Sequence, residues 1–165
     1  MTLILDTDIL SMFAKADAIS VLKALFGEMN LAITPGIEEE ISIPLDYGYK
    51  FPSRALLEVK IIPITEEALL EYNRLLKGVR SLGKGELEAI ATCRVNGYIF
   101  ATNDFVARKF AKTEGVHVVS LQSIMRALWK SEIKTKEEVK KLLNKIEKSD
   151  NLTISKKIEK EIFKE

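Results

Sequence analysis

The sequence is poor in the side chains that carry nucleophilic or multi-cysteine chemistry. Its 165 residues include one cysteine, Cys93, and one histidine, His117. A single cysteine excludes an intramolecular disulfide and a zinc site built from several cysteines, and it is typical of a reduced, cytoplasmic setting. We expect Cys93 to be a small buried apolar residue and His117, which lies within an apolar run, to be structural.

Long hydrophobic runs are also lacking. No stretch approaches the ~18 uninterrupted apolar residues of a membrane helix, and Asp6 and Asp8 interrupt the N-terminal apolar run, so we expect neither a signal peptide nor a membrane partner. The net charge is only +1. A near-neutral chain can still act on nucleic acid, because a bound divalent metal reverses the sign of a local acidic cluster.

What is present is a pair of apolar runs that each end at a carboxylate. Residues 3–5 (Leu-Ile-Leu) lead to Asp6, and residues 98–102 lead through Asn103 to Asp104. This pattern is typical of buried strands that deliver an acid to the carboxyl edge of a parallel sheet. If the two strands are neighbours, Asp6 and Asp104 converge on one crevice, where their charge requires a cation.

Short strand-like runs alternate with helical periodicity along the chain. We expect strands near residues 3–5, 31–34, 59–64, 98–102 and 116–120. The alternation predicts an α/β fold: a three-layer α/β/α domain with a mostly parallel sheet of about five strands. We place this domain at residues 1–130. Residues 131–165 then form amphipathic helices that pack on the domain or on a partner.

Two more acids belong to helices. On a helix from residue 86 to 95, Glu86 lies on the same stripe as Ile90 and Cys93, which predicts that it faces inward. Glu88 lies about 200° further round, and we expect it to be solvated.

The run Glu38-Glu39-Glu40 requires a choice. Glu40 lies beside the inward-facing Ile41 and is the candidate for the crevice, with Glu39 as the alternative. A solvated charge run near a helix N-terminus is the simpler interpretation. Asp8 is expected to cap the first helix or to support the site.

Four segments together resemble a known family. They are Leu5-Asp6-Thr7-Asp8, residues 34–41 (TPGIEEEI), residues 85–91 (GELEAIA) and residues 101–104 (ATND). In this order and spacing they resemble a PIN domain, and they are most similar to the small prokaryotic members grouped with VapC-type toxins. The resemblance covers residues 1 to about 130.

The resemblance implies a metal-dependent ribonuclease. Asp6, Glu40, Glu86 and Asp104 would bind one or two Mg²⁺ or Mn²⁺ ions for hydrolysis of RNA phosphodiester bonds, with Thr102 and Asp8 in support. It also implies a toxin of a toxin-antitoxin pair, with an antitoxin protein as partner, that forms a homodimer. The chain departs from the toxins at Glu86, where they often have Asp.

Basic and aromatic residues near the expected mouth supply substrate candidates. Lys84 and Arg108 either meet RNA phosphate or are ordinary surface charges. Residues 47–51 carry two tyrosines and a phenylalanine that either stack on bases or pack within their loop, and we expect the packing role.

Two rival interpretations stay open. The first is a catalytically silent PIN-like module that binds RNA or a protein. The second is a phosphatase of the haloacid-dehalogenase type, which residues 4–8 resemble, although a matching lysine and Asp-Asp pair are lacking.

Overall fold

The apolar run at the N-terminus forms the central strand of the sheet. The computed structural model describes residues 1–165. Strand β1 (Thr2–Leu5) is buried along its whole length and pairs in parallel with β2 (Asn30–Ile33) and β4 (Ile99–Ala101). The short strands β3 (Lys60–Ile61) and β5 (His117–Val119) form the edges, in the order β3-β2-β1-β4-β5. All four pairings are parallel, which confirms the predicted α/β fold.

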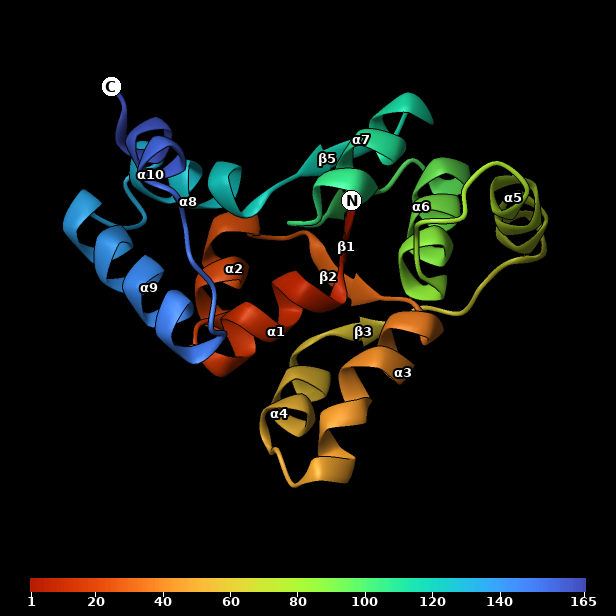
Figure 1. The fold of residues 1–165 in the computed structure, drawn as a ribbon, viewed down its shortest axis with the longest axis horizontal. Helices are drawn as coiled ribbons and strands as arrows, with labels where there is room; N and C mark the ends of the chain where they lie inside the picture. Colours follow the sequence, from red (N-terminus) through yellow and green to blue (C-terminus); the bar gives the residue numbers. More distant parts are fainter.

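Helices cover both faces of this sheet. Parallel strands are joined by right-handed crossovers, so the change of direction between β3 and β4 sends later helices to the opposite face. Figure 1 shows α1 and α2 on one side of β1, with α5 and α6 on the other. The first group is α1 (Thr7–Lys15), α2 (Ile19–Phe26), α3 (Pro35–Ser42), the 3₁₀ turn η1 (Ile43–Tyr47) and α4 (Phe51–Glu58). The second is α5 (Glu66–Leu76), α6 (Lys84–Asn96) and α7 (Phe105–Thr113).

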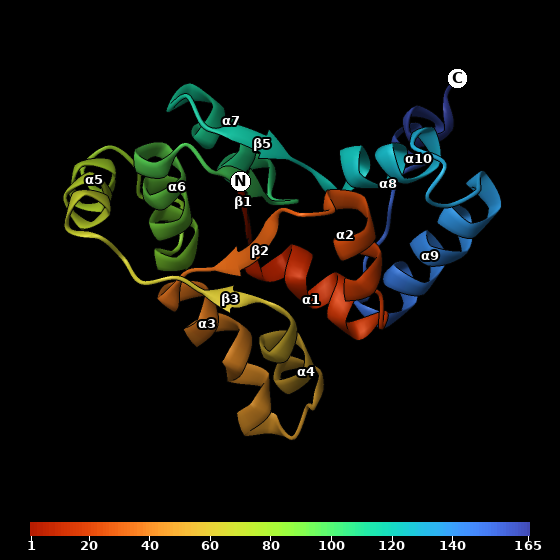
Figure 2. The same ribbon diagram turned by 180° about the vertical axis from the view of Figure 1, so that it is seen from behind.

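Three C-terminal helices extend the first layer: α8 (Leu121–Lys130), α9 (Lys136–Ser149) and α10 (Lys156–Phe163). Helix α9 packs on α1 and α8, and α10 packs on α8 (Figure 2). Their buried side chains Val139, Ile146 and Ile162 belong to the same apolar core as the sheet. The division of the chain at residue 130 remains a prediction.

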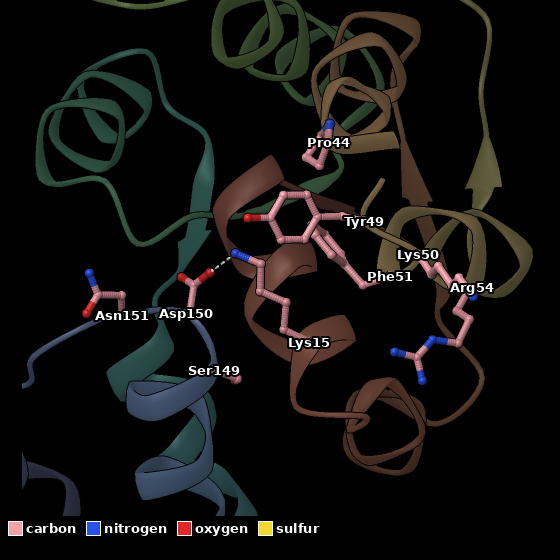
Figure 3. Close-up of a pocket in the computed structure, with 9 residues that line it drawn as sticks. All are labelled: Lys15, Pro44, Tyr49, Lys50, Phe51, Arg54, Ser149, Asp150 and Asn151. Atoms are coloured by element: carbon pink, nitrogen blue, oxygen red, sulfur yellow. Dashed lines mark hydrogen bonds and ion pairs between the residues drawn. The ribbon is translucent and has the colours of Figure 1, made fainter. Parts of the chain in front are cut away.

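Polar contacts also join the C-terminal segment to the rest of the chain. The Lys15 ammonium, at the end of α1, lies 2.5 Å from the Asp150 carboxylate after α9 (Figure 3). The Trp129 indole N–H donates to the carbonyl oxygen of Ile162 at 2.7 Å. These contacts fix α9 and α10 against α1 and α8.

The aromatic loop before α4 is only partly packed. The Phe51 ring is 8% exposed and lies 5.0 Å from the Lys15 ammonium (Figure 3). Tyr47 and Tyr49 are 77% and 60% exposed. The expected packing role is therefore correct for Phe51 and for Tyr49, because the two rings lie 6.3 Å apart in an edge-on contact. Tyr47, the more exposed of the two tyrosines, makes no such contact.

Two expectations from composition can be compared with the structure. Cys93 is buried on α6, as expected, and burial raises the pKa of its thiol. None of the helices combines the length and the apolar composition that a membrane span needs.

Candidate active site

Asp6 stands at the carboxyl end of the central strand. Its Oδ1 accepts the Thr7 backbone N–H at 2.9 Å, so that it caps α1, and its Oδ2 accepts the Thr102 hydroxyl at 2.6 Å. Thr102 reaches it because β1 and β4 pair with Leu5 opposite Ala101. The side chain is only 3% exposed. Burial, followed by the charge of Asp8, raises the pKa of Asp6 to about 8, although the Thr102 hydrogen bond opposes the shift.

Asp8 connects the ends of β1 and β4. Its Oδ1 accepts the Ile9 N–H at 2.7 Å and its Oδ2 accepts the Asn103 N–H at 3.2 Å. Burial raises the pKa of Asp8 to about 6, with smaller contributions from the charges of Asp104 and Glu86. Asp8 therefore lies close enough to Asp104 and Glu86 for their charges to affect its pKa, and it is part of the same acidic cluster.

Asp104 follows β4 and caps α7. Its Oδ1 accepts the Ala107 N–H at 2.7 Å, which is the usual contact of an N-cap aspartate. The residue is exposed, so one oxygen of its carboxylate remains open to a ligand from solution.

Glu86 enters the cluster from the first turn of α6. Its Oε2 accepts the Gly83 N–H at 3.0 Å and so caps the helix. Burial raises the pKa of Glu86, and the charges of Asp104 and Glu40 raise it further. The residue is half-buried and faces the other acids.

Glu40 reaches the same place from the end of α3. Its Oε2 accepts the Thr7 hydroxyl at 2.6 Å and its Oε1 accepts the Gly85 N–H at 3.1 Å. Glu39 is exposed instead and lies 3.1 Å from the Lys84 ammonium. Of the two alternatives in the Glu38-Glu39-Glu40 run, Glu40 is thus the residue beside the other acids.

No cation of the protein neutralises this cluster. The ion pairs of the structure all involve other acids, and none includes Asp6, Glu86 or Asp104. Burial raises the pKa values of Asp6, Asp8 and Glu86, and the charges of neighbouring acids raise them further. In this arrangement no three acidic, histidine or cysteine side chains form a ready-made metal site. The donors are nevertheless all carboxylates, the oxygen ligands that Mg²⁺ and Mn²⁺ prefer.

The predicted position of Glu88 is wrong. Glu88 is 9% exposed, and its Oε1 accepts the Gly36 N–H at 2.6 Å. Thr34 precedes α3 but its hydroxyl makes no hydrogen bond, so the carboxylate from α6 satisfies the positive end of that helix instead. The glycine at position 36 is the one feature of the sequence that indicates a close approach to the start of α3. A Cβ there would lie 3.1 Å from Glu88 Oε1.

The two predicted substrate residues have different surroundings. Lys84 is exposed and paired with Glu39. Arg108, on α7, donates from Nη1 to the Asn103 carbonyl oxygen at 3.3 Å and makes no ion pair. The sequence gives no sign of the contacts that Asn103 and Thr7 make with Asp8 and Glu40, because each contact joins separate elements.

Comparisons with known proteins identify the class of this fold. A family model described as a PIN domain matches residues 2–165. No curated protein sequence matches the chain.

Solved structures show the same fold at low identity. A VapBC2 complex from Rickettsia felis, bound to a promoter DNA fragment, is 17% identical, has a TM-score of 0.59 and aligns with 73% of this chain and 98% of its own. VapBC-1 from nontypeable Haemophilus influenzae is 16% identical, with a TM-score of 0.54 over 73% and 98%. A PilT N-terminus domain protein from Sulfolobus solfataricus is 18% identical, with a TM-score of 0.52 over 81% and 96%.

The molecule is therefore a parallel α/β protein of the PIN type, with acids gathered at the carboxyl edge of its sheet. The chain belongs to the PIN domain family. Membership supports a nuclease role in general terms, and the family assignment made from the four sequence motifs is confirmed.

Proposed function

We propose that the protein is a divalent-metal-dependent ribonuclease that hydrolyses RNA phosphodiester bonds. The observation that carries this proposal is the gathering of Asp6, Asp8, Glu40, Glu86 and Asp104 at one edge of the sheet without a cationic partner. Such a cluster costs stability unless a cation neutralises it. The family assignment favours this function over the phosphatase of the haloacid-dehalogenase type.

Asp6, Glu86 and Asp104, with Glu40, are the residues that would hold Mg²⁺ or Mn²⁺. The bound ion supplies Lewis-acid activation of water and neutralises charge that develops on the phosphate. The chain's own contribution is positioning. The Thr102 hydroxyl holds Asp6, the Gly83 N–H holds Glu86, and Thr7 with Gly85 holds Glu40.

Cleavage of a labelled single-stranded RNA in Mn²⁺ tests this function. We expect Asp6→Asn, Glu86→Gln and Asp104→Asn each to lower the cleavage rate at least about 100-fold, because each removes a charge that positions the ion. Glu39→Gln is the control, since Glu39 is exposed and pairs only with Lys84. Urea unfolding of each variant establishes that it folds. Cleavage retained in all three would contradict the site.

A second function follows from the lack of a ready-made metal site. A binding module without turnover would bind RNA or a protein through the same edge. Such a module would show little stabilisation by Mn²⁺, and Asp6→Asn would leave its affinity for RNA intact.

Partners are part of the same proposal. The structures from R. felis and H. influenzae are of VapBC assemblies, and by analogy we propose that this chain is a toxin held by an antitoxin and forms a homodimer in the cytoplasm. Co-expression with the product of an adjacent short reading frame, followed by size-exclusion chromatography, tests for the complex. A chain that elutes alone, as a monomer, would contradict both the antitoxin complex and the homodimer.

A further inference from the structure

A cavity lined by basic residues lies between α7, the end of β5 and the start of α8. Its volume is about 380 Å³. Three of its side chains are cationic and none is acidic, and most of the others carry hydroxyl or amide groups. The lining residues are Arg108, Lys112, Val118, Ser120, Gln122, Ser123 and Arg126.

The three cations of this cavity have no anionic partner. Arg108 and Arg126 donate only to backbone carbonyl oxygens, Arg108 to Asn103 and Arg126 to Glu161 and Lys164 at 2.7 Å each. Lys112 is exposed and takes part in no ion pair. Like charges gather here without compensation, so an anion is the ligand that would stabilise them.

Another cavity, of about 540 Å³, differs in this respect (Figure 3). It also contains basic residues, but Lys15 is paired with Asp150, and Arg54 lies 3.9 Å from Asp17. Its cations are therefore partly neutralised by the protein itself.

The basic cavity adjoins the acidic cluster. Strands β4 and β5 pair with Ala101 opposite Val119, so that Ser120 and Thr102 leave the same edge of the sheet. Arg108 donates to the Asn103 carbonyl oxygen, and the Asn103 N–H donates to Asp8. Two consecutive hydrogen bonds thus connect a cation of the cavity to an acid of the cluster.

We infer that this cavity binds a backbone phosphate of the RNA next to the one that is cleaved. The inference rests on the proposed function and extends it to the substrate. Acids that hold a metal repel the neighbouring phosphates of a polyanion, and unpaired cations beside them offset that repulsion. Arginine fits this role because its guanidinium can donate two hydrogen bonds to one phosphate.

The C-terminal helices contribute to this site indirectly. Arg126 lies in the cavity while its Nη1 holds the carbonyl oxygens at the end of α10. Helix α10 therefore positions a cation that would contact substrate, which gives residues 131–165 a part in RNA binding.

The salt dependence of RNA binding tests the inference. Binding is measured by the fluorescence anisotropy of a labelled single-stranded RNA that is titrated with the full chain. The titration is done in EDTA, which removes divalent metal and so prevents cleavage. For single strands the slope of log K against log [salt] changes by ~0.7 for each phosphate contact. We expect Lys112→Ala and Arg108→Ala each to reduce the slope by about 0.7, which is a roughly threefold smaller loss of affinity between 50 and 200 mM salt.

Lys109→Ala is the matched control, because Lys109 is on the same helix but lines a different cavity, with Val106 and Phe110. Lys112 makes no hydrogen bond or ion pair that its removal would break, so its variant keeps the test valid if Arg108→Ala fails to fold. Equal slopes for Lys112→Ala, Lys109→Ala and the unaltered chain would overturn the inference, as would a complete lack of RNA binding by the unaltered chain.

Two further results separate this inference from the nuclease proposal and from binding of free phosphate. RNA binding whose salt slope falls in Lys112→Ala, without any cleavage of that RNA in Mn²⁺, would support the phosphate site and overturn the nuclease. Inorganic phosphate that stabilises the unaltered chain but not Lys112→Ala, with identical RNA slopes, would identify a site for free phosphate and overturn the inference.

Discussion

Burial of a site carboxylate destabilises its charged form, and Asp6 is the most deeply buried acid of the site. Asp6 illustrates the cost: its pKa is about 8 against an ordinary 3.8, chiefly because it is buried. Between about pH 4 and pH 8 the folded chain keeps a proton that the unfolded chain has released. The free energy of unfolding therefore falls as pH rises through this window.

Asp6→Asn should remove much of this pH dependence. In EDTA we expect the variant to be more stable than the unaltered chain at pH 8, by up to about 5 kcal/mol, and similar to it at pH 4. The single carbonyl oxygen of asparagine can still accept one of the two donors that Asp6 accepts, the Thr7 N–H or the Thr102 hydroxyl. Urea unfolding at the two pH values measures the difference. An unchanged difference between pH 4 and pH 8 in the variant would show that the burial of Asp6 is not its cause.

Gly85 is the residue that admits Glu40 to the cluster. A Cβ at Gly85 would lie 2.6 Å from Glu40 Oε1, too close for both to stay in place. Because Glu40 is the flexible partner, we expect Gly85→Ala to change the unfolding free energy by less than about 1 kcal/mol but to lower RNA cleavage about 100-fold.

Gly78→Ala provides the control for Gly85→Ala. A Cβ there meets only the Leu75 carbonyl oxygen, at an ordinary 3.8 Å. Cleavage by Gly85→Ala at the rate of Gly78→Ala would show that the position of Glu40 is unimportant.

Residues at strand ends were easier to predict than residues on helices. Asp6 and Asp104 follow apolar runs, and the parallel pairing of adjacent strands brings their ends to one edge. Glu88 was misjudged because helical periodicity measures direction from one helix alone. Its carboxylate is directed at Gly36 of another helix, a contact that depends on how α3 and α6 pack.

At the scale of elements, the short runs were located correctly but their lengths were not. The expected strand at residues 59–64 is reduced to Lys60–Ile61, because β3 is an edge strand that pairs only with β2. Helix α6 runs from Lys84 to Asn96 rather than from 86 to 95. Pattern sets the type of an element, whereas its ends depend on its neighbours.

Helix α10 has one fully buried side chain. Ile162 is fully buried in the core, whereas Ile158, one turn earlier, is 40% exposed. We expect Ile162→Ala to lower the unfolding free energy by about 2–5 kcal/mol and Ile158→Ala by less than about 1 kcal/mol. Urea denaturation compares the two. Equal effects would contradict the observed packing of α10 on α8.

At the scale of the whole molecule, the candidate site is assembled from four separate parts of the chain. Asp6 follows β1, Glu40 ends α3, Glu86 begins α6 and Asp104 begins α7. A cation bound by these acids would link both helical layers to the sheet, and its binding free energy would add to the stability of the entire fold.

Mn²⁺ should therefore stabilise the molecule, and more strongly as the acids lose their protons. At about 100 times its dissociation constant the ion adds ~2.7 kcal/mol to the unfolding free energy. We expect a larger rise in melting temperature at pH 8 than at pH 5.5, because protonated Asp6 and Asp8 at the lower pH compete with the metal. Thermal unfolding with and without Mn²⁺ measures this, with Glu39→Gln as the variant that keeps the response and Asp104→Asn as the one that loses it. The same response in both would mean that the ion binds elsewhere, and the acidic cluster would then be a cost to the fold that no metal offsets.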